Sequence, residues 1–444
     1  MAIAPDIQGN QWLNCEKLSL NDFLGSVVVM IFWSFGCEAS QERLRQLAEV
    51  QKAVGDSLVV IGIHSPRFEY EKDSVSVTQA LVQHNINIPV IHDTQYQNWN
   101  NYNPEGWPAT VVVGSDGTII GRQAGSGDIS VVLEAILSGL DETNEEDATK
   151  NIQYKTASES ENSVGYLTKV SANANNKLVY NDPAAGTVTI VNLSERLDIG
   201  TKIRVLDNFK YPSSVLITDD DDIYITDSYN GSLTKYNLES QELSVLTKDL
   251  IAPSGITQDF DSSLVISDGG ADQIMRVIEN YDSESETGPI AGIGLTGCED
   301  GNANVAELAQ PSGLVRTEVG IVFCDAASSK LRMLTDNSKI NTLNGVCDFS
   351  WGFNDGTAEN TLFQRPSDVC TDKDGALVIV DTGNHVLRKL SRREFKTLNI
   401  SNLNRPEGIC SLPSGHLIVA NTGNQEILVI DPSGKSVWPL EIVE

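Results

Sequence analysis

Cys37 is the residue whose position in this sequence most suggests covalent chemistry. In the stretch FWSFGCEAS it follows an apolar run at 27–32 and precedes a helix-like run at 40–54. A helix N-terminus carries partial positive charge and free N–H groups, which stabilise a thiolate. Glu38 opposes this effect, because it places an anion beside the thiol. A lone reactive cysteine can form a mixed disulfide, a glutathione adduct or a sulfenic acid, but needs an outside thiol to complete a cycle.

Other residues with reactive side chains are dispersed along the chain. The histidines have no metal-ligand spacing, and the acidic run at 218–222 lacks the glycine and spaced acids of a calcium loop, so no metal site is expected. No phosphate-binding glycine loop, nucleophile elbow or pair of catalytic carboxylates stands out, and no cofactor is expected. His64 follows a strand end and could border the thiol site, although a surface or capping role is the simpler interpretation.

Charge and cysteine content exclude several classes of protein. The 444 residues carry a net charge of −30, which repels nucleic acid and anionic membranes. No secretory signal is visible, and no apolar stretch approaches the ~18 residues of a membrane span. The seven cysteines are odd in number and scattered, unlike a disulfide framework, so we expect a reduced, cytoplasmic protein. The sequence does not show whether Cys298 and Cys347 approach each other.

The elements around Cys37 predict an α/β domain over residues 1–142. Apolar strands and helix-like runs alternate before an acidic, polar stretch at 143–163, which is typical of a linker. Continuous apolar strands such as 27–32 and 58–63 indicate a central sheet that is covered on both faces.

Short strands repeat from residue 164 to residue 444. The repeat is marked by acidic or amide residues that end a strand: Asp182, Asp227, Asp268, Asp325, Asp381 and Asn421. Prolines precede the last five markers by 14 or 15 residues: Pro212, Pro253, Pro311, Pro366 and Pro406. Two units carry insertions, each with an Asp-Gly pair. Six units of roughly 40 residues predict an all-β propeller with six blades, in which the repeated aspartate hydrogen-bonds its own turn.

The whole chain resembles proteins of the NHL-repeat-containing protein 2 type, which join a thioredoxin-like domain to an NHL-repeat β-propeller. In the first domain the resemblance lies in residues 12–40 and in GWPATVVVGSDGTIIGRQAGSGD; in the second it lies in the QPSGL and VDTGNHVLRKL units. These motifs are specific for the family and much less specific for an activity.

The resemblance implies a thiol site with a missing partner. Phe32 and Trp33 match the strand end of thioredoxin-like folds, Cys37 matches the first, nucleophilic cysteine, and Ser40 stands where the resolving cysteine would be. An alternative register places Cys37 second, but the three-residue gap after Trp33 favours the first register. Pro108 matches the family's cis-proline, which faces the active cysteine, and Trp107 would flank the same groove.

Two functions remain open from the sequence. The first is a binding protein in which the propeller and the degenerate C-x-x-S domain bind a protein or a small ligand, on a propeller face or in an interdomain cleft. The second is a monothiol redox protein that uses Cys37 in thiol–disulfide exchange or in reaction with peroxide. Enzymatic activity is therefore uncertain. Cys15 is the only other cysteine in the first domain and would be the first candidate for an internal resolving thiol.

Overall fold

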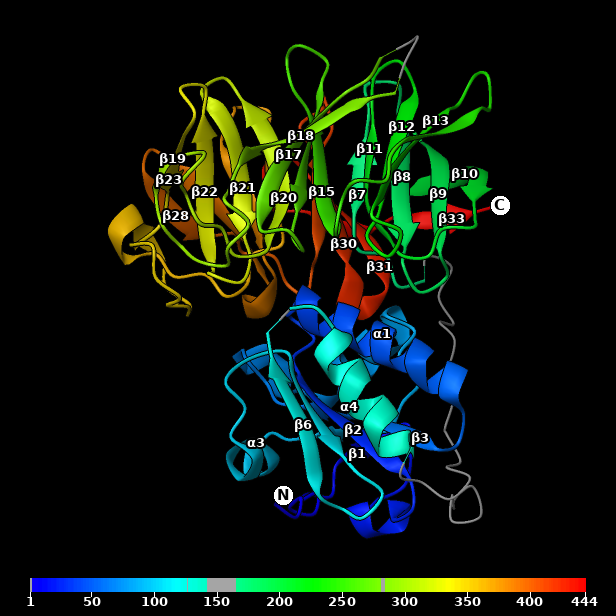
Figure 1. The fold of residues 1–444 in the computed structure, drawn as a ribbon. Helices are drawn as coiled ribbons and strands as arrows, with labels where there is room; N and C mark the ends of the chain where they lie inside the picture. The colour runs from blue at the N-terminus through cyan, green and yellow to red at the C-terminus, as the bar shows by residue number, and fades with distance from the viewer. Residues whose placement is uncertain (1, 126, 142–164, 281–283) are drawn as a thin grey trace. The chain divides into compact units, whose positions relative to one another are not determined.

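The computed structural model describes residues 2–125, 127–141, 165–280 and 284–444. The chain divides into two compact units, Met1–Glu159 and Ser160–Glu444 (Figure 1). This division falls inside the predicted linker at 143–163, and that linker lies outside the described residues. Each unit is considered by itself below.

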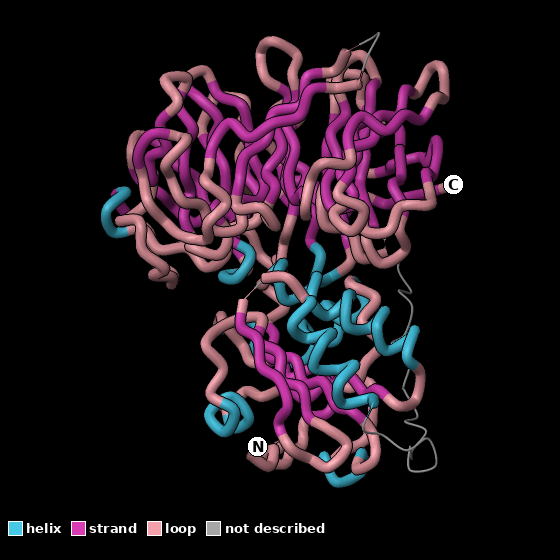
Figure 2. Tube along the Cα trace, viewed as in Figure 1, coloured by secondary structure: helices cyan, strands magenta, loops and turns pink. Residues whose placement is uncertain are grey.

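The first unit is a six-stranded sheet with helices on its faces, as Figure 2 shows by secondary structure. The strands are β1 (Trp12–Leu13), β2 (Val27–Trp33), β3 (Leu58–His64), β4 (Val90–His92), β5 (Ala109–Val113) and β6 (Ile119–Ala124). The helices are η1 (Leu20–Phe23), α1 (Glu38–Val54), η2 (Glu69–Lys72), α2 (Ser74–Gln83), α3 (Gln97–Tyr102) and α4 (Ser130–Asp141). The sheet order is β1-β4-β3-β2-β5-β6, with β2, β3 and β4 parallel and β5 antiparallel to β2.

The packing of β2 on both faces of the sheet explains why its sequence is continuously apolar. Val29 and Ile31 join a core cluster with side chains of α1, α2 and α4, while Met30 and Phe32 join a second cluster with Tyr102 of α3. Successive strand residues point to opposite faces, so a strand covered on both faces needs apolar residues throughout. The predicted covered sheet is therefore confirmed.

The second unit is an all-β propeller of six blades, as predicted. Blades 1 to 3 contain β7 (Val170–Ala172), β8 (Lys177–Asp182), β9 (Thr187–Leu193), β10 (Ile199–Leu206), then β11 (Pro212–Ile217), β12 (Asp222–Asp227), β13 (Ser232–Asn237), β14 (Leu243–Thr247), then β15 (Pro253–Gln258), β16 (Leu264–Asp268), β17 (Gln273–Ile278), β18 (Glu286–Ala291). Blades 4 and 5 contain β19 (Gly301–Asn302), β20 (Pro311–Thr317), β21 (Gly320–Asp325), β22 (Lys330–Thr335), β23 (Lys339–Thr342), then β24 (Gly356–Thr357), β25 (Asp368–Thr371), β26 (Leu377–Asp381), β27 (Val386–Ser391), β28 (Glu394–Thr397). Blade 6 contains β29 (Gly408–Ser411), β30 (Leu417–Asn421), β31 (Glu426–Ile430) and β32 (Val437–Pro439), and β33 (Glu441–Val443) belongs to blade 1. Three short helices, η3 (Ala358–Asn360), η4 (Thr382–Asn384) and η5 (Thr422–Asn424), lie in the loops.

The ring of blades is closed. The inner strands β7, β11, β15, β20, β25 and β29 contact one another in that order, and β29 contacts β7. Strand β33 pairs in parallel with β10, so strands from both ends of this unit share one blade.

The serine that follows the repeated proline joins consecutive blades. Ser254 Oγ donates to the carbonyl of Pro311 in the next blade (2.7 Å), and Ser312 Oγ donates to the carbonyl of Ser367 (2.9 Å). The proline-serine motif therefore serves the assembly of the ring.

The repeated aspartates do more than the sequence predicts. Asp227 accepts from the backbone N–H of Tyr229 and Asn230 in its own turn, as expected. It also accepts from Lys210 and Tyr211, the two residues before the inner strand of its blade. One carboxylate thus fixes two segments that are distant in the sequence.

The two insertions add a fifth outer strand to blades 4 and 5, namely β19 and β24. In blade 4, the fully buried Arg332 lies between the strand-end Asp325 (3.2 Å) and Asp300 of the insertion (3.0 Å). Blade 5 repeats this arrangement around Arg388. The Asp-Gly pairs therefore supply carboxylates to buried arginines.

Candidate functional site

Cys37 lies where a strand gives way to a helix. Strand β2 ends at Trp33, a three-residue loop follows, and Cys37 is the N-cap residue of α1. The backbone N–H groups of Ser40 and Gln41 donate to the Cys37 carbonyl at 3.0 and 3.1 Å, which closes the first turn. The predicted position of the thiol at a helix start is confirmed.

Pro108 joins this site from the start of β5, the strand that pairs with β2. The Trp107–Pro108 peptide bond is cis, as the resemblance implied. The Cys37 Sγ lies 3.8 Å from the carbonyl oxygen of Trp107 and donates a weak hydrogen bond to it. Two motifs separated by about 70 residues therefore meet.

Ser40 stands where the resemblance places the resolving thiol. It is fully buried on α1, and in the part of the chain that the structure describes its Oγ has no hydrogen-bond partner. A hydroxyl cannot form a disulfide, so this position cannot complete an exchange that Cys37 begins.

Cys15 is remote from Cys37. Cys15 lies two residues after Leu13, which is level with Val90 and Ile31 across the sheet. From Leu13 the chain runs toward the start of β2, whereas Cys37 lies beyond the end of β2. Three strand spacings also separate β1 from β2, about 14 Å. Disulfide formation needs Cα atoms within about 7 Å, so Cys15 is not a resolving thiol in this fold.

The expected surface position of His64 is wrong, because its side chain is fully buried and borders the loop that leads into Cys37. The ring stacks on Phe35 with centroids 5.5 Å apart and contacts the rings of Trp33 and His92 at 4.8 and 5.0 Å. Its Nε2 accepts from the backbone N–H of Phe35 at 3.4 Å. Burial lowers the pKa of His64 well below its usual value, and His92 lowers it further. His64 and Trp33 therefore support the loop before Cys37.

Glu71 is the residue that sequence reasoning missed. It lies on η2, is fully buried, and accepts from Ser34 Oγ (2.8 Å), Gly36 N (2.9 Å) and Arg67 N (2.7 Å). Its carboxylate thus holds both ends of the loop that leads into Cys37. Nothing in the stretch EYEK indicates this role, because it depends on how β3 and η2 pack beside β2.

A pair of tryptophans lies beside Pro108. The rings of Trp107 and Trp99 have centroids 4.4 Å apart, and Trp107 Nε1 donates to the carbonyl of Ser65 at 2.9 Å. Both side chains are only half-buried. The backbone carbonyl of Trp107 contacts Cys37, so Trp107 lies beside the thiol, and a groove that it would flank stays a prediction.

The propeller contains a small polar cavity on its axis. It has a volume of about 180 Å³ and is lined mainly by residues of the inner strands, and a second cavity of about 410 Å³ lies among the adjoining hairpin loops. Lys169 Nζ donates to the carbonyl of Ser367 (2.7 Å) and lies 3.4 Å from the Asp368 carboxylate. Burial raises the pKa of Asp368, and Lys169 opposes that shift. In the ranges that the structure describes, no group of three metal-ligating side chains comes together.

The expectation of a fully reduced protein is wrong for two cysteines. Cys298 and Cys347 form a disulfide with Cα atoms 5.2 Å apart. They come from the two insertions, whose approach could not be read from the sequence. The other five cysteines, all among the described residues, are not joined by disulfides. Among the described helices, none has both the length and the apolar character needed to cross a membrane.

Comparisons with known proteins agree with this architecture. The AhpC/TSA family matches residues 2–122, and the NHL repeat matches residues 363–390 and 403–430. NHL repeat-containing protein 2 from Bos taurus is 24% identical over 458 residues, which cover 89% of this chain and 62% of that protein. Protein SUPPRESSOR OF QUENCHING 1, chloroplastic, from Arabidopsis thaliana is 24% identical over 431 residues, which cover 85% of this chain and 40% of that protein.

A third relative resembles the first unit alone. The thiol-disulfide oxidoreductase YkuV from Bacillus subtilis is 27% identical over 141 residues, which cover 31% of this chain and 95% of YkuV. The chain spans 40% to 62% of the two relatives that it matches over both units. It therefore combines a thioredoxin-like domain that matches the AhpC/TSA family with an NHL-repeat β-propeller, and over 89% of its length it is similar to NHL repeat-containing protein 2.

Proposed function

We propose that this protein is a binding protein that captures a partner through Cys37 as a mixed disulfide. One observation carries the proposal: Cys37 is the N-cap residue of α1 and its thiol lies against the cis-proline loop, while a buried serine stands where a resolving thiol would be expected. Such a site can begin thiol–disulfide exchange and cannot finish it alone. Binding and monothiol chemistry, the two functions that the sequence left open, then become two aspects of one event.

The capture step conserves atoms and electrons. The Cys37 thiolate attacks one sulfur of a partner's disulfide, a new S–S bond forms, and the partner's other sulfur leaves as a thiolate. Ser40 has no sulfur with which to attack the mixed disulfide, so release needs an outside thiol.

The propeller supplies the second binding surface in this proposal. Propellers present a rigid face built from loops, and the cavity of about 410 Å³ lies among such loops. Asn173, Asp219, Asp372 and Lys373 are among its lining residues, so it suits a small polar ligand or a polar side chain of a protein partner. We place the protein in the cytoplasm, where glutathione would be the releasing thiol.

The test uses oxidised glutathione as the probe. The full chain is incubated with it, and adducts on each cysteine are identified by mass spectrometry of peptides. We expect a stable adduct on Cys37, no adduct in Cys37→Ser, and loss of the adduct on addition of a free thiol. Cys15→Ser is the matched control and should behave as the natural chain. A Cys37 that alkylating reagents modify but oxidised glutathione does not would contradict the proposal.

A peroxide-reactive thiol is the second candidate, because the AhpC/TSA match includes Cys37. In that reaction the Cys37 thiolate takes one oxygen from hydrogen peroxide, giving a sulfenic acid and releasing hydroxide. Treatment with hydrogen peroxide followed by dimedone would label Cys37 in the natural chain and not in Cys37→Ser. Unlabelled Cys37 would remove this candidate and leave capture untouched.

A further inference from the structure

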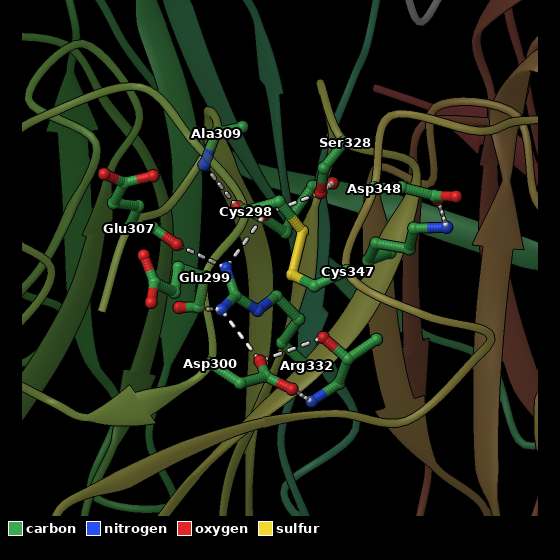
Figure 3. The surroundings of a disulfide bond; sticks show 12 residues. Cys298, Glu299, Asp300, Glu307, Ala309, Ser328, Arg332, Cys347 and Asp348 are labelled. Atoms are coloured by element: carbon green, nitrogen blue, oxygen red, sulfur yellow. Dashed lines mark hydrogen bonds and ion pairs between the residues drawn. A yellow bond between two sulfur atoms is a disulfide. The ribbon is translucent and has the colours of Figure 1, made fainter.

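The disulfide of the propeller joins two insertions that are otherwise separate. Cys298 lies in the insertion before β20 and Cys347 in the insertion before β25 (Figure 3). Both residues are half-buried and neither lies in a helix or strand. Exchange at these loop residues does not require a blade strand to open, and partly exposed disulfides are the more readily exchanged ones.

The first insertion is anchored independently of the disulfide. Arg332 on β22 donates to the carbonyls of Glu307 (2.6 Å) and Glu299 (2.9 Å) and to the carboxylate of Asp300 (3.0 Å). Figure 3 shows this guanidinium beside the residues that flank Cys298. Because Arg332 is fully buried and bonded on several sides, the loop keeps its position whether or not the sulfur atoms are joined.

The second insertion has its own anchor on the same strand. Lys330 Nζ lies 2.8 Å from the carboxylate of Asp348 and 3.1 Å from Ser350 Oγ. Burial alone would raise the pKa of Asp348, but hydrogen bonds from Lys330 and Ser350 lower it to about 2. Lys330 and Arg332 are two residues apart on β22, so both side chains leave the same face of that strand.

From these contacts we propose that Cys298 and Cys347 form a second thiol–disulfide exchange site, which an external dithiol reduces while the propeller stays folded. The two buried cations of β22 hold the cysteine-bearing loops together in the reduced state, so the bond re-forms readily on oxidation. The site takes dithiols and disulfides as substrates and does not depend on Cys37.

The reaction is a two-electron exchange. One thiolate of the external dithiol attacks Cys298 or Cys347, a mixed disulfide forms, and the other cysteine leaves as a thiolate. The second thiolate of the dithiol attacks the mixed disulfide, so that the external dithiol is oxidised and both protein cysteines are reduced. Oxidation of the pair by an external disulfide is the reverse sequence.

The first experiment uses the full chain with Cys37→Ser, so that a failure of the capture proposal cannot affect the result. The folded protein is treated with increasing dithiothreitol and then with N-ethylmaleimide, and labelled cysteines are identified by mass spectrometry. We expect Cys298 and Cys347 to be labelled together, with an unchanged far-ultraviolet circular dichroism spectrum. Cys324 and Cys370 are internal controls, because burial raises their pKa well above the usual value and they should stay unlabelled.

Three outcomes would overturn the proposal. The pair could resist dithiothreitol until denaturant is added, which would make it purely structural. Reduction could unfold the propeller, which would show that the anchors are insufficient. Both cysteines could be labelled before reduction, which would mean that no disulfide forms.

A second experiment tests the anchors themselves. Asp348→Asn weakens the contact with Lys330, so re-formation of the disulfide by oxidised dithiothreitol should be slower, by about five- to tenfold. Asp374→Asn is the matched control, because Asp374 pairs with Lys373 in an exposed hairpin and its replacement makes the same change in charge. Equal rates in the two variants would overturn the role of the anchors.

Discussion

The two sulfur sites of this chain are assembled in different ways. Around Cys37, nine consecutive residues supply the strand end, the loop, the thiol and the helix start, and Pro108 is added from one distant loop. Around Cys298 and Cys347, two insertions supply one sulfur each and β22 supplies both cations. The first site has the helix N-terminus and lacks a second sulfur. The second has both sulfurs and no helix, so the two sites should favour different steps of thiol exchange.

Ser40→Cys should have the largest effect, on disulfide-reducing activity, because it gives the Cys37 site a second sulfur, which only the Cys298–Cys347 site has. The natural chain should not reduce insulin above a Cys37→Ser background when a thioredoxin reductase supplies electrons. With a sulfur in the first turn of α1, turnover should rise at least about 100-fold above that background. Turnover by the natural chain itself would mean that another sulfur resolves the intermediate.

Cys298→Ser should have the next largest effect, which is a loss of stability of the propeller. The bond closes a loop with a sequence separation of 49, so its loss should lower the free energy of unfolding by about 2–4 kcal/mol. Urea unfolding of the oxidised chain and of the variant measures the difference. Reduced natural protein should match the variant; a large gap between them would show that the serine disturbs the loop in another way.

Glu71→Gln should weaken the first site and leave the second unaffected. Glutamine retains one acceptor oxygen, so the loop at Ser34 and Gly36 loses part of its support. Capture of oxidised glutathione by Cys37 should slow by about tenfold, or ~1.4 kcal/mol. Glu69→Gln on the same short helix is the control, since Glu69 pairs with Lys72 at the surface. Equal rates in the two variants would remove Glu71 from the site.

The smallest expected effect is on the pH dependence of the stability of the first unit. Burial lowers the pKa of His64, so below about pH 6.5 the unfolded chain binds a proton that the folded chain does not. Stability of the first unit should therefore fall with decreasing pH, by at most ~1.4 kcal/mol per pH unit for this group. His64→Gln should flatten this dependence in urea unfolding between pH 7 and 5.5, although the lowered pKa of His92 leaves part of it. His416→Gln, in the propeller, is the control and should leave the slope unchanged.

Features encoded within one short stretch were predictable. The run from Phe32 to Ser40 indicated a strand, a thiol and a helix start, and the six repeated strand-end residues indicated the number of blades. The meeting of Cys37 with Pro108 required a resemblance, since no local pattern links them. Strand β1 and helix α3 were missed because two and six residues are too short to show a period.

Features that depend on packing were not predictable. The burial of His64 follows from the register of β3 between β2 and β4, where a polar residue ends an apolar strand and still lies inside. Glu71 reaches the thiol loop only after η2 packs beside β2. The disulfide depends on two insertions that meet around β22, and spacing along the chain contains no information about that meeting.

The pairing of β33 with β10 has a consequence for the order of folding during synthesis. Blades 2 to 6 each form from one continuous segment, so each can close as soon as its own strands have been made. Blade 1 has to wait for residues 441–443, and until then the outer edge of β10 at residues 199–201 is unpaired. An unpaired strand edge invites pairing with other chains. The growing propeller is therefore most exposed to misassembly until its final strand leaves the ribosome.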